Sequence, residues 1–248
     1  MLTEVFSDIL SHTHGLSFIE MVKVSTDEDE TKIEAMDEDR TVVLYGKLNS
    51  RVDDLEGVVG LSRMAVLAGY LKFPSFTEDG AKVEIVKQTR GEAEVPAEIK
   101  FSSSDGHDAV YRFMYKDAVE DLIQVPKFKG VQWDVVITPT EKNLKDLSYF
   151  NNILGAFEPV FTAKTEGTDL NLYIGSGSTD KATVPFASDI SGSLSGNLSW
   201  PLVETLAILK LAQKAEDCTM SFSSKGALKI EMSTGLASYE YILPARTR

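Results

Sequence analysis

The 248-residue chain has a length that suits one large domain or two domains of ordinary size. Hydrophobic residues make up 43% of it and charged residues 25%, a balance typical of proteins with buried cores. No apolar run approaches the roughly 20 residues that a membrane-spanning helix needs, so we expect no membrane association. The start of the chain lacks a secretory signal pattern, and the single cysteine, Cys218, excludes an internal disulfide framework. Both features favour a cytoplasmic location.

The charge balance is strongly acidic. Lys and Arg number 25 against 38 Asp and Glu, which gives a formal net charge of −13. Such a chain is not expected to bind DNA through general electrostatic attraction. Its three histidines and one cysteine leave few side chains for a His/Cys metal site, so we expect no metal and no cofactor.

The first half of the chain predicts two helices, each followed by three strands. Apolar residues recur every three or four positions from Leu2 to Leu10 and predict an amphipathic helix that ends before Gly15. A second helix follows Gly60 and ends before Pro74, which cannot continue a helix. Its predicted apolar stripe comprises Leu61, Met64, Ala65, Ala68 and Leu71. The predicted strands cover residues 18–24, 32–36, 40–48, 82–88, 97–102 and 109–115.

The second half predicts a similar order. A strand over residues 133–138 leads into a helix from Thr140 to about Phe157, with Thr140 as its N-cap. Another helix runs from Pro201 to about Lys214, with proline in the favoured first turn. The predicted strands cover residues 160–165, 170–175, 219–223, 227–233 and 238–243, and a Ser/Gly-rich stretch lies around residues 192–198.

These patterns indicate an internal duplication of an α+β unit. We expect an N-terminal domain over residues 1–115, a connector over residues 116–132 and a C-terminal domain over residues 133–248. Each domain is expected to hold two helices packed on antiparallel sheets.

No constellation in the sequence indicates catalysis. His12 and His14 stand two residues apart, so they would not face each other on a helix. The Gly-rich stretch at residues 175–178 lacks the Lys-Ser/Thr of a phosphate loop and predicts a hairpin turn. Cys218 has no histidine near it in sequence. We therefore expect a protein that is not an enzyme.

Basic residues oppose the apolar stripe on three of the four predicted helices. Ordinary solvated helix faces would explain any one of them, but the shared feature favours one positively charged surface lined by the helices. The candidate residues for this surface are Arg63, Lys142, Lys145, Lys210 and Lys214.

At this level the chain resembles the ring-shaped DNA sliding clamps, in the two-domain form of proliferating-cell nuclear antigen (PCNA) and of T4-like phage clamps. Residues 33–37, Ile-Glu-Ala-Met-Asp, followed by residues 40–44, Arg-Thr-Val-Val-Leu, are similar to the clamp pattern before an outer strand. Residues 239–245, Tyr-Glu-Tyr-Ile-Leu-Pro-Ala, are similar to the end of these clamps. The resemblance covers essentially the whole chain.

The resemblance implies the α+β DNA-clamp fold, closing into a ring of three copies with helices facing a central hole. It implies that the protein is a DNA polymerase processivity factor that encircles duplex DNA and tethers the polymerase. The implied partners are duplex DNA, DNA polymerase, a clamp loader ATPase and other copies of the chain in a homotrimer. A basic lining within an acidic exterior would also account for the net charge.

The resemblance further implies a pocket for short hydrophobic partner peptides near the connector. The positions matching that pocket are Met36, Arg40, Thr41, Leu122, Ile123, Val125, Leu243, Pro244 and Ala245. The run Leu122, Ile123 and Val125 predicts an exposed apolar patch in a charged segment, or a connector that packs on its own sheet. The divergent motifs favour a viral member, such as that of a bacteriophage, which would act in the host cytoplasm.

One alternative function remains open from the sequence. An acidic, duplicated, β-rich chain could act without forming a ring, as a viral interaction protein or a DNA mimic that blocks a host enzyme. The mass in solution distinguishes the two, since a clamp is a trimer and the mimic a monomer.

Overall fold

The structure is a computed structural model that describes residues 2–178 and 180–247. The chain forms two compact units. Unit 1 comprises Met1–Glu38, Leu44–Pro126 and Leu236–Ser238, and unit 2 comprises Asp39–Val43, Lys127–Gly235 and Tyr239–Arg248. No helix in the described part of the chain combines the length and the apolar character needed to cross a bilayer.

Unit 1 begins with the predicted amphipathic helix, α1 (Leu2–Ser11). Its buried residues are Val5, Phe6, Ile9 and Leu10, which confirms the predicted apolar stripe. A short 3-10 helix at His14–Leu16 follows it. Helix α2 (Met64–Leu71) packs against α1 within the unit.

The second helix starts later than the sequence predicted. Leu61 ends a strand, β4 (Gly57–Leu61), which the prediction lacked. Arg63 precedes the first turn of α2 in the left-handed region, with φ of 50°, so it does not lie on the helix. The buried face consists of Met64, Leu67 and Leu71. The predicted stripe was therefore wrong to include Leu61 and Ala65. The helix begins only at Met64, so Leu61 belongs to strand β4, and Ala65 is exposed.

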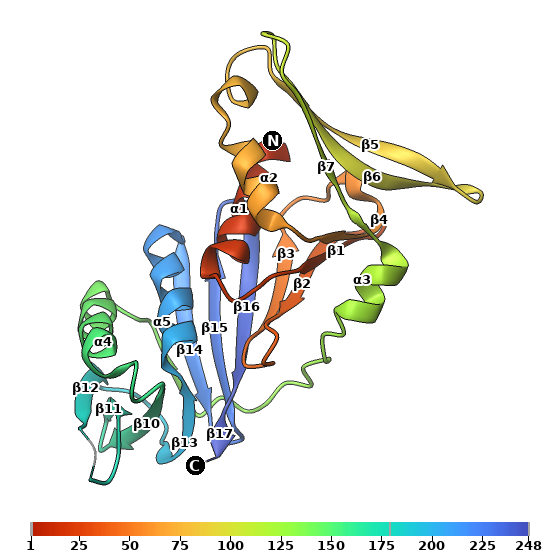
Figure 1. The fold of residues 1–248 in the computed structure, drawn as a ribbon. Coiled ribbons are helices and arrows are strands. Elements are labelled where there is room, and N and C mark those ends of the chain that lie inside the picture. The colour runs from red at the N-terminus through yellow and green to blue at the C-terminus, as the bar shows by residue number, and fades with distance from the viewer. Residues whose placement is uncertain (1, 179, 248) are drawn as a thin grey trace. The chain divides into compact units, whose positions relative to one another are not determined.

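The remaining strands of unit 1 form two antiparallel groups (Figure 1). The first has the order β8-β4-β1-β2-β3 and the second the order β5-β6-β7. The strands of the first group are β1 (Val22–Thr26), β2 (Thr31–Met36), β3 (Val43–Leu48), β4 and β8 (Met114–Tyr115). Those of the second are β5 (Lys82–Arg90), β6 (Ala93–Ser102) and β7 (Asp108–Arg112). Two further 3-10 turns lie at Asp53–Leu55 and Pro74–Phe76.

Helix α3 (Lys116–Leu122) closes unit 1 against β4. Gly60 allows this close packing, because a Cβ atom at that position would lie 2.2 Å from Cγ2 of the Val119 side chain. Val119 is fully buried. A residue without a side chain is thus required where the strand passes under the helix.

Unit 2 is likewise built from a pair of helices and two groups of strands. Its helices are α4 (Glu141–Leu154) and α5 (Leu202–Leu211), which pack on each other, and a 3-10 turn at Ala212–Lys214 follows α5. One strand group has the order β12-β11-β10-β13-β17 and another the order β16-β15-β14-β9. The first consists of β10 (Val160–Glu166), β11 (Asp169–Ile174), β12 (Ala182–Ala187), β13 (Ser195–Pro201) and β17 (Arg246–Thr247). The second consists of β9 (Val135–Ile137), β14 (Asp217–Ser223), β15 (Ala227–Ser233) and β16 (Ala237–Pro244).

The N-terminus of α4 confirms the predicted cap. The Thr140 hydroxyl accepts a hydrogen bond from the Asn143 backbone N–H at 3.2 Å, and Asn143 Oδ1 accepts one from the Thr140 backbone N–H at 2.8 Å. This reciprocal pair is a capping box, with Asn in place of the usual Glu or Gln. It determines where the helix begins.

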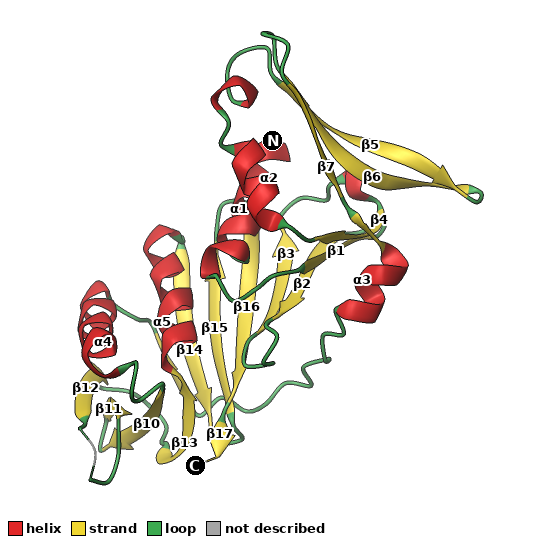
Figure 2. Cartoon of the chain, in the orientation of Figure 1, coloured by secondary structure: helices red, strands yellow, loops and turns green. Residues whose placement is uncertain are grey.

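The two units repeat one topology (Figure 2). Each contains the series helix, four strands, helix and three strands in chain order, which runs from α1 to β7 in unit 1 and from α4 to β16 in unit 2. The group β4-β1-β2-β3 matches β13-β10-β11-β12, and β5-β6-β7 matches β14-β15-β16. The predicted duplication of an α+β unit is confirmed, with β4, β12 and β13 as strands that the prediction lacked.

Candidate functional surfaces

The five basic residues predicted to line one surface lie at or near the helices, but they differ in their partners. Lys142 Nζ lies 2.6 Å from Asp146 Oδ2, and Lys145 Nζ lies 2.7 Å from Glu141 Oε1. Both lysines are exposed, with 79% and 71% of their side-chain surfaces accessible. Each pair joins residues one helical turn apart, so α4 carries no net charge from these four residues.

The other three basic residues have no carboxylate partner within the described residues. Arg63 is exposed at the start of α2, Lys210 lies in the last turn of α5 and Lys214 in the 3-10 turn after it. A lysine at a helix C-terminus interacts favourably with the helix dipole while its ammonium group stays in solvent. These cations are therefore available to an external anion.

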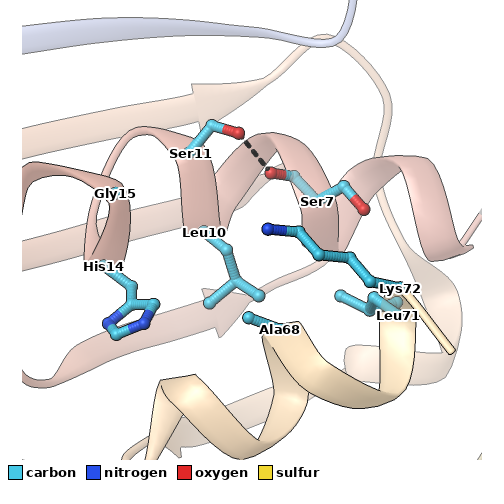
Figure 3. A pocket seen from close by; sticks show the side chains of 8 residues that line it. All are labelled: Ser7, Leu10, Ser11, His14, Gly15, Ala68, Leu71 and Lys72. Atoms are coloured by element: carbon cyan, nitrogen blue, oxygen red, sulfur yellow. Dashed lines mark hydrogen bonds between the residues drawn. The ribbon is translucent and has the colours of Figure 1, made fainter.

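A hollow of about 170 Å³ lies between α1 and α2 in unit 1 (Figure 3). Its floor is apolar, and serine hydroxyls, an imidazole and an ammonium group surround it. The eight lining residues are Ser7, Leu10, Ser11, His14, Gly15, Ala68, Leu71 and Lys72. The sequence did not single out this set, because its members come from two helices more than 50 positions apart and share no spacing.

A second hollow, of about 450 Å³, lies between the start of α4 and the end of α5 in unit 2. Its lining includes the Glu141 carboxylate, whose pKa is held below its usual value mainly by the hydrogen bond from Lys145. The other lining residues are Pro139, Thr140, Leu144, Ala212 and Gln213. The two hollows thus differ in the charge that they present.

The nine residues of the implied peptide pocket are divided between the units. Unit 1 holds Met36, Leu122, Ile123 and Val125, and unit 2 holds Arg40, Thr41, Leu243, Pro244 and Ala245. Arg40 and Pro244 are exposed, whereas Thr41 and Leu243 are buried. Met36, Val125 and Ala245 are half-buried.

The apolar run at the end of α3 is only partly exposed. Leu122 is 57% exposed and Ile123 is 6% exposed. The Ile123 N–H donates to the Val119 carbonyl oxygen at 2.8 Å, which ends the helix. Ile123, the residue that follows α3, therefore agrees with the alternative of a packed connector, whereas Leu122 is exposed as a surface patch requires.

The two neighbouring histidines have separate environments. His12 is buried, and the loss of solvent lowers its pKa to about 4. His14 lies on the hollow of unit 1. Within residues 2–178 and 180–247, no group of three or more His, Cys, Asp or Glu is placed to hold a metal ion.

The arrangement described above is similar to that of known proteins in structure but not in sequence. No family model matches the sequence, and a search of curated proteins gives no match. Solved structures do match. PCNA from Thermococcus kodakaraensis is similar with a TM-score of 0.65 and 10% identity, over 99% of this chain and 96% of that chain. PCNA from Entamoeba histolytica gives a TM-score of 0.64 and 11% identity, over 99% and 94%. A chain of the PCNA2–PCNA3 complex from Sulfolobus tokodaii gives 0.64 and 14%, over 99% and 97%. The chain therefore has the DNA-clamp fold of PCNA, as its resemblance to the sliding clamps implied.

Proposed function

We propose that this chain is the subunit of a DNA sliding clamp, a processivity factor that encircles duplex DNA and tethers the replicative polymerase. The supporting observation is the match to PCNA over 99% of the chain, which includes both topological repeats. A tethered polymerase stays at high effective concentration near the primer end, and this effect needs no catalytic group. Under this proposal, the protein is not an enzyme.

The proposed ring is a homotrimer whose copies contact one another head to tail. A heterologous contact closes into a ring when its rotation completes a circle. The PCNA2–PCNA3 complex supports this proposal, because there two chains of the same fold assemble with each other. Each subunit would contribute its two repeats to the ring.

The proposed ring contacts DNA through its helices. Topological linkage does not require tight affinity, so a few phosphate contacts suffice, and many would make binding strong and salt-dependent. The unpaired cations Arg63, Lys210 and Lys214 are the better candidates for these contacts, and Lys142 and Lys145 would contribute less while they remain paired. The net charge of −13 would discourage DNA from binding outside the ring.

The proposed partners are a DNA polymerase and a clamp loader ATPase, acting in the cytoplasm. Their short hydrophobic peptides would bind near Leu122, Pro244 and the other residues of the implied pocket. The complex of the FEN-1 C-terminal region with A. fulgidus PCNA supports this mode, since a PCNA chain there binds a terminal segment of a partner. A bacteriophage replication system, with the host cytoplasm as its location, is the setting that the divergent motifs favour.

The mass of the particle in solution tests the proposal. We expect sedimentation equilibrium to give three times the chain mass at micromolar concentration, and electron micrographs to show a ring with a central hole. A monomer over the whole accessible concentration range, with no ring on DNA after addition of a loader, would instead favour the acidic DNA mimic.

A further inference from the structure

The two repeats share a rule of strand pairing. Strand β4 precedes α2 and pairs with β1, the first strand after α1. Strand β13 precedes α5 and pairs with β10, the first strand after α4. Strand β9 precedes α4 and pairs with β14, the first strand after α5. In each of these cases, the strand before one helix of a pair lies antiparallel to the first strand after the other helix.

Strand β5 lacks such a neighbour in the part of the chain that the structure describes. It is the first strand after α2, and by the same rule it would pair with a strand that precedes α1. No described strand precedes α1, and β5 has only β6 beside it, so it ends its sheet (Figure 1). Its nine residues, Lys82–Arg90, include no glycine and no proline. A long edge strand presents a row of N–H and C=O groups that can pair with a further strand.

Burial shows what the unpaired edge leaves open. No residue of β5 is buried, whereas five of the seven residues of its paired counterpart β14 are buried. Val83 and Ile85 are only half-buried, although their partners on β6, Phe101 and Ile99, are fully buried. Residues directly opposite each other on paired strands share one face of the sheet. Apolar side chains of a further strand would therefore continue this buried row.

The charged side chains of β5 determine which strand fits. Lys82, Lys87 and Arg90 are basic and Glu84 is acidic, so this strand is positive within a chain of net charge −13. Both lysines are exposed, and neither forms an ion pair within the described residues. Lysines along an edge repel a second copy of the same edge. They attract a strand that carries carboxylates.

We propose that the outer edge of β5 binds an extended, acidic segment of a partner protein as an additional antiparallel strand. Backbone hydrogen bonds would provide the affinity, and apolar residues at alternate positions would pack beside Val83 and Ile85. Carboxylates of the segment would pair with Lys82 and Lys87. Residues Lys82–Val86 pair with β6 in unbroken register, so the edge is most regular there. The inference does not rest on the proposed function, and this edge shares no residue with the implied peptide pocket.

Strand β9 provides the sequence of a probe, because it occupies the equivalent edge in unit 2. Its residues Val135 and Ile137 are buried and Val136 is exposed, the alternation expected of an added strand. A synthetic peptide of residues 133–138, flanked by glutamates, is added to the full-length protein, and amide hydrogen exchange is followed by mass spectrometry. We expect slower exchange within residues 82–90. Strands β7 and β12 also end their sheets in the described chain and are the internal controls. Protection there instead of at β5, or no binding at all, would contradict the proposal.

Two N-methylated forms of the peptide, equal in charge, test whether the backbone forms the contact. In an antiparallel strand, alternate residues direct their N–H groups to the same side. Methylation of one alternate set of amides should abolish the protection of β5, and methylation of the other set should leave it in place. Equal binding of both forms would show attraction by charge alone and would overturn the proposed strand pairing.

Charge-reversal variants test the choice of an acidic partner. Lys82→Glu with Lys87→Glu should weaken binding of the peptide about tenfold at low salt. Lys127→Glu with Lys129→Glu is the matched control, since these exposed connector lysines also form no ion pair within the described residues. Equal weakening in both variants would reduce the effect to the net charge and contradict the assignment to β5. A DNA duplex that itself protects β5 would likewise overturn it, whereas a monomeric chain that binds the peptide at β5 would contradict the clamp proposal alone.

Discussion

The charge that a helix presents to DNA depends on neighbours one turn away. On α4, Glu141 and Asp146 neutralise Lys145 and Lys142, although the sequence pattern shows the lysines as a basic face. Spacing of four residues between opposite charges could have indicated this pairing in advance. A count of basic residues on a helix is thus an incomplete measure of its affinity for phosphate.

Removing the two acids tests whether α4 faces DNA. In Glu141→Gln with Asp146→Asn, both lysines become unpaired, so binding to a short duplex should strengthen and its log–log salt slope should rise by up to about 1.8. Fluorescence anisotropy at several salt concentrations measures both quantities. Glu166→Gln is the control, because it frees Lys164 in the same way on strand β10. Equal behaviour of the double variant and the control would place α4 away from DNA.

Burial of His12 predicts a dependence of stability on pH. Its pKa is about 4 in the folded chain and about 6.5 when unfolded, so the unfolded state binds more protons between these values. The contribution of His12 is complete above pH 6.5 and decreases as pH falls toward 4. We expect the free energy of unfolding to fall by about 2 kcal/mol from this residue between pH 7 and pH 5.

Urea unfolding at both pH values measures this effect. Since other groups also titrate, the relevant quantity is the difference between wild type and His12→Phe, which should lose less stability on acidification by about 2 kcal/mol. The same loss in both proteins would show that His12 is protonated in the folded chain.

At the scale of elements, α3 depends on a glycine of the strand beneath it. Gly60→Ala should destabilise the chain by about 1–3 kcal/mol, because the added Cβ would overlap the Val119 side chain. Thermal unfolding measures the loss. Gly69→Ala in α2 is the matched control, since nothing lies within 4 Å of its Cβ position and alanine favours a helix. Val119→Ala in the Gly60→Ala background should recover part of the lost stability, and no recovery would argue against this contact.

The adjacent residues Leu122 and Ile123 at the end of α3 are expected to differ in role, Leu122 in partner binding and Ile123 in stability. Leu122→Ser should weaken binding of a polymerase C-terminal peptide by about 1–3 kcal/mol and leave the melting temperature unchanged, because Leu122 is exposed. Ile123→Ser should lower stability by about 2–4 kcal/mol, because it is buried. Calorimetric titration and thermal melting of both variants test this division. Unchanged affinity of Leu122→Ser would place the peptide elsewhere.

Long, periodic elements were predictable from the sequence, and short Gly- or Ser-rich strands were not. The stripe of α1 and the Thr140 cap of α4 are local signals, and the structure confirms both. Strand β4 contains Gly57 and Gly60, and β13 begins Ser195-Gly196, so neither resembles a strand by composition. They exist because they pair with β1 and β10, contacts that a local pattern does not contain.

The sites were less predictable than the fold for the same reason. The hollow of unit 1 joins Ser7 and His14 to Lys72, which the folding of two separate helices brings together. Burial of Ile123 likewise depends on the packing of α3 on β4. Individual basic residues could be named from the sequence, but their pairing and their surroundings required the folded chain.

At the scale of the whole molecule, the proposed clamp must remain on DNA although its subunit is acidic and is not strongly attracted to DNA. Ring closure separates retention from affinity: a clamp around closed circular DNA leaves only by opening, whereas an electrostatically bound protein leaves at a rate set by salt. This mode of retention belongs to the proposed function, and what the comparison shows is the PCNA-like fold along the chain. Retention on DNA therefore tests the proposal without assumptions about any single residue.

The most direct measurement follows the labelled protein on nicked circular DNA after loading, in a high-salt wash, before and after one restriction cut. We predict that the protein remains on the circle through the wash and is lost within minutes once the circle is linearised, and that a block at both ends of the linear DNA prevents the loss. Retention that is sensitive to salt but unchanged by linearisation would contradict the account.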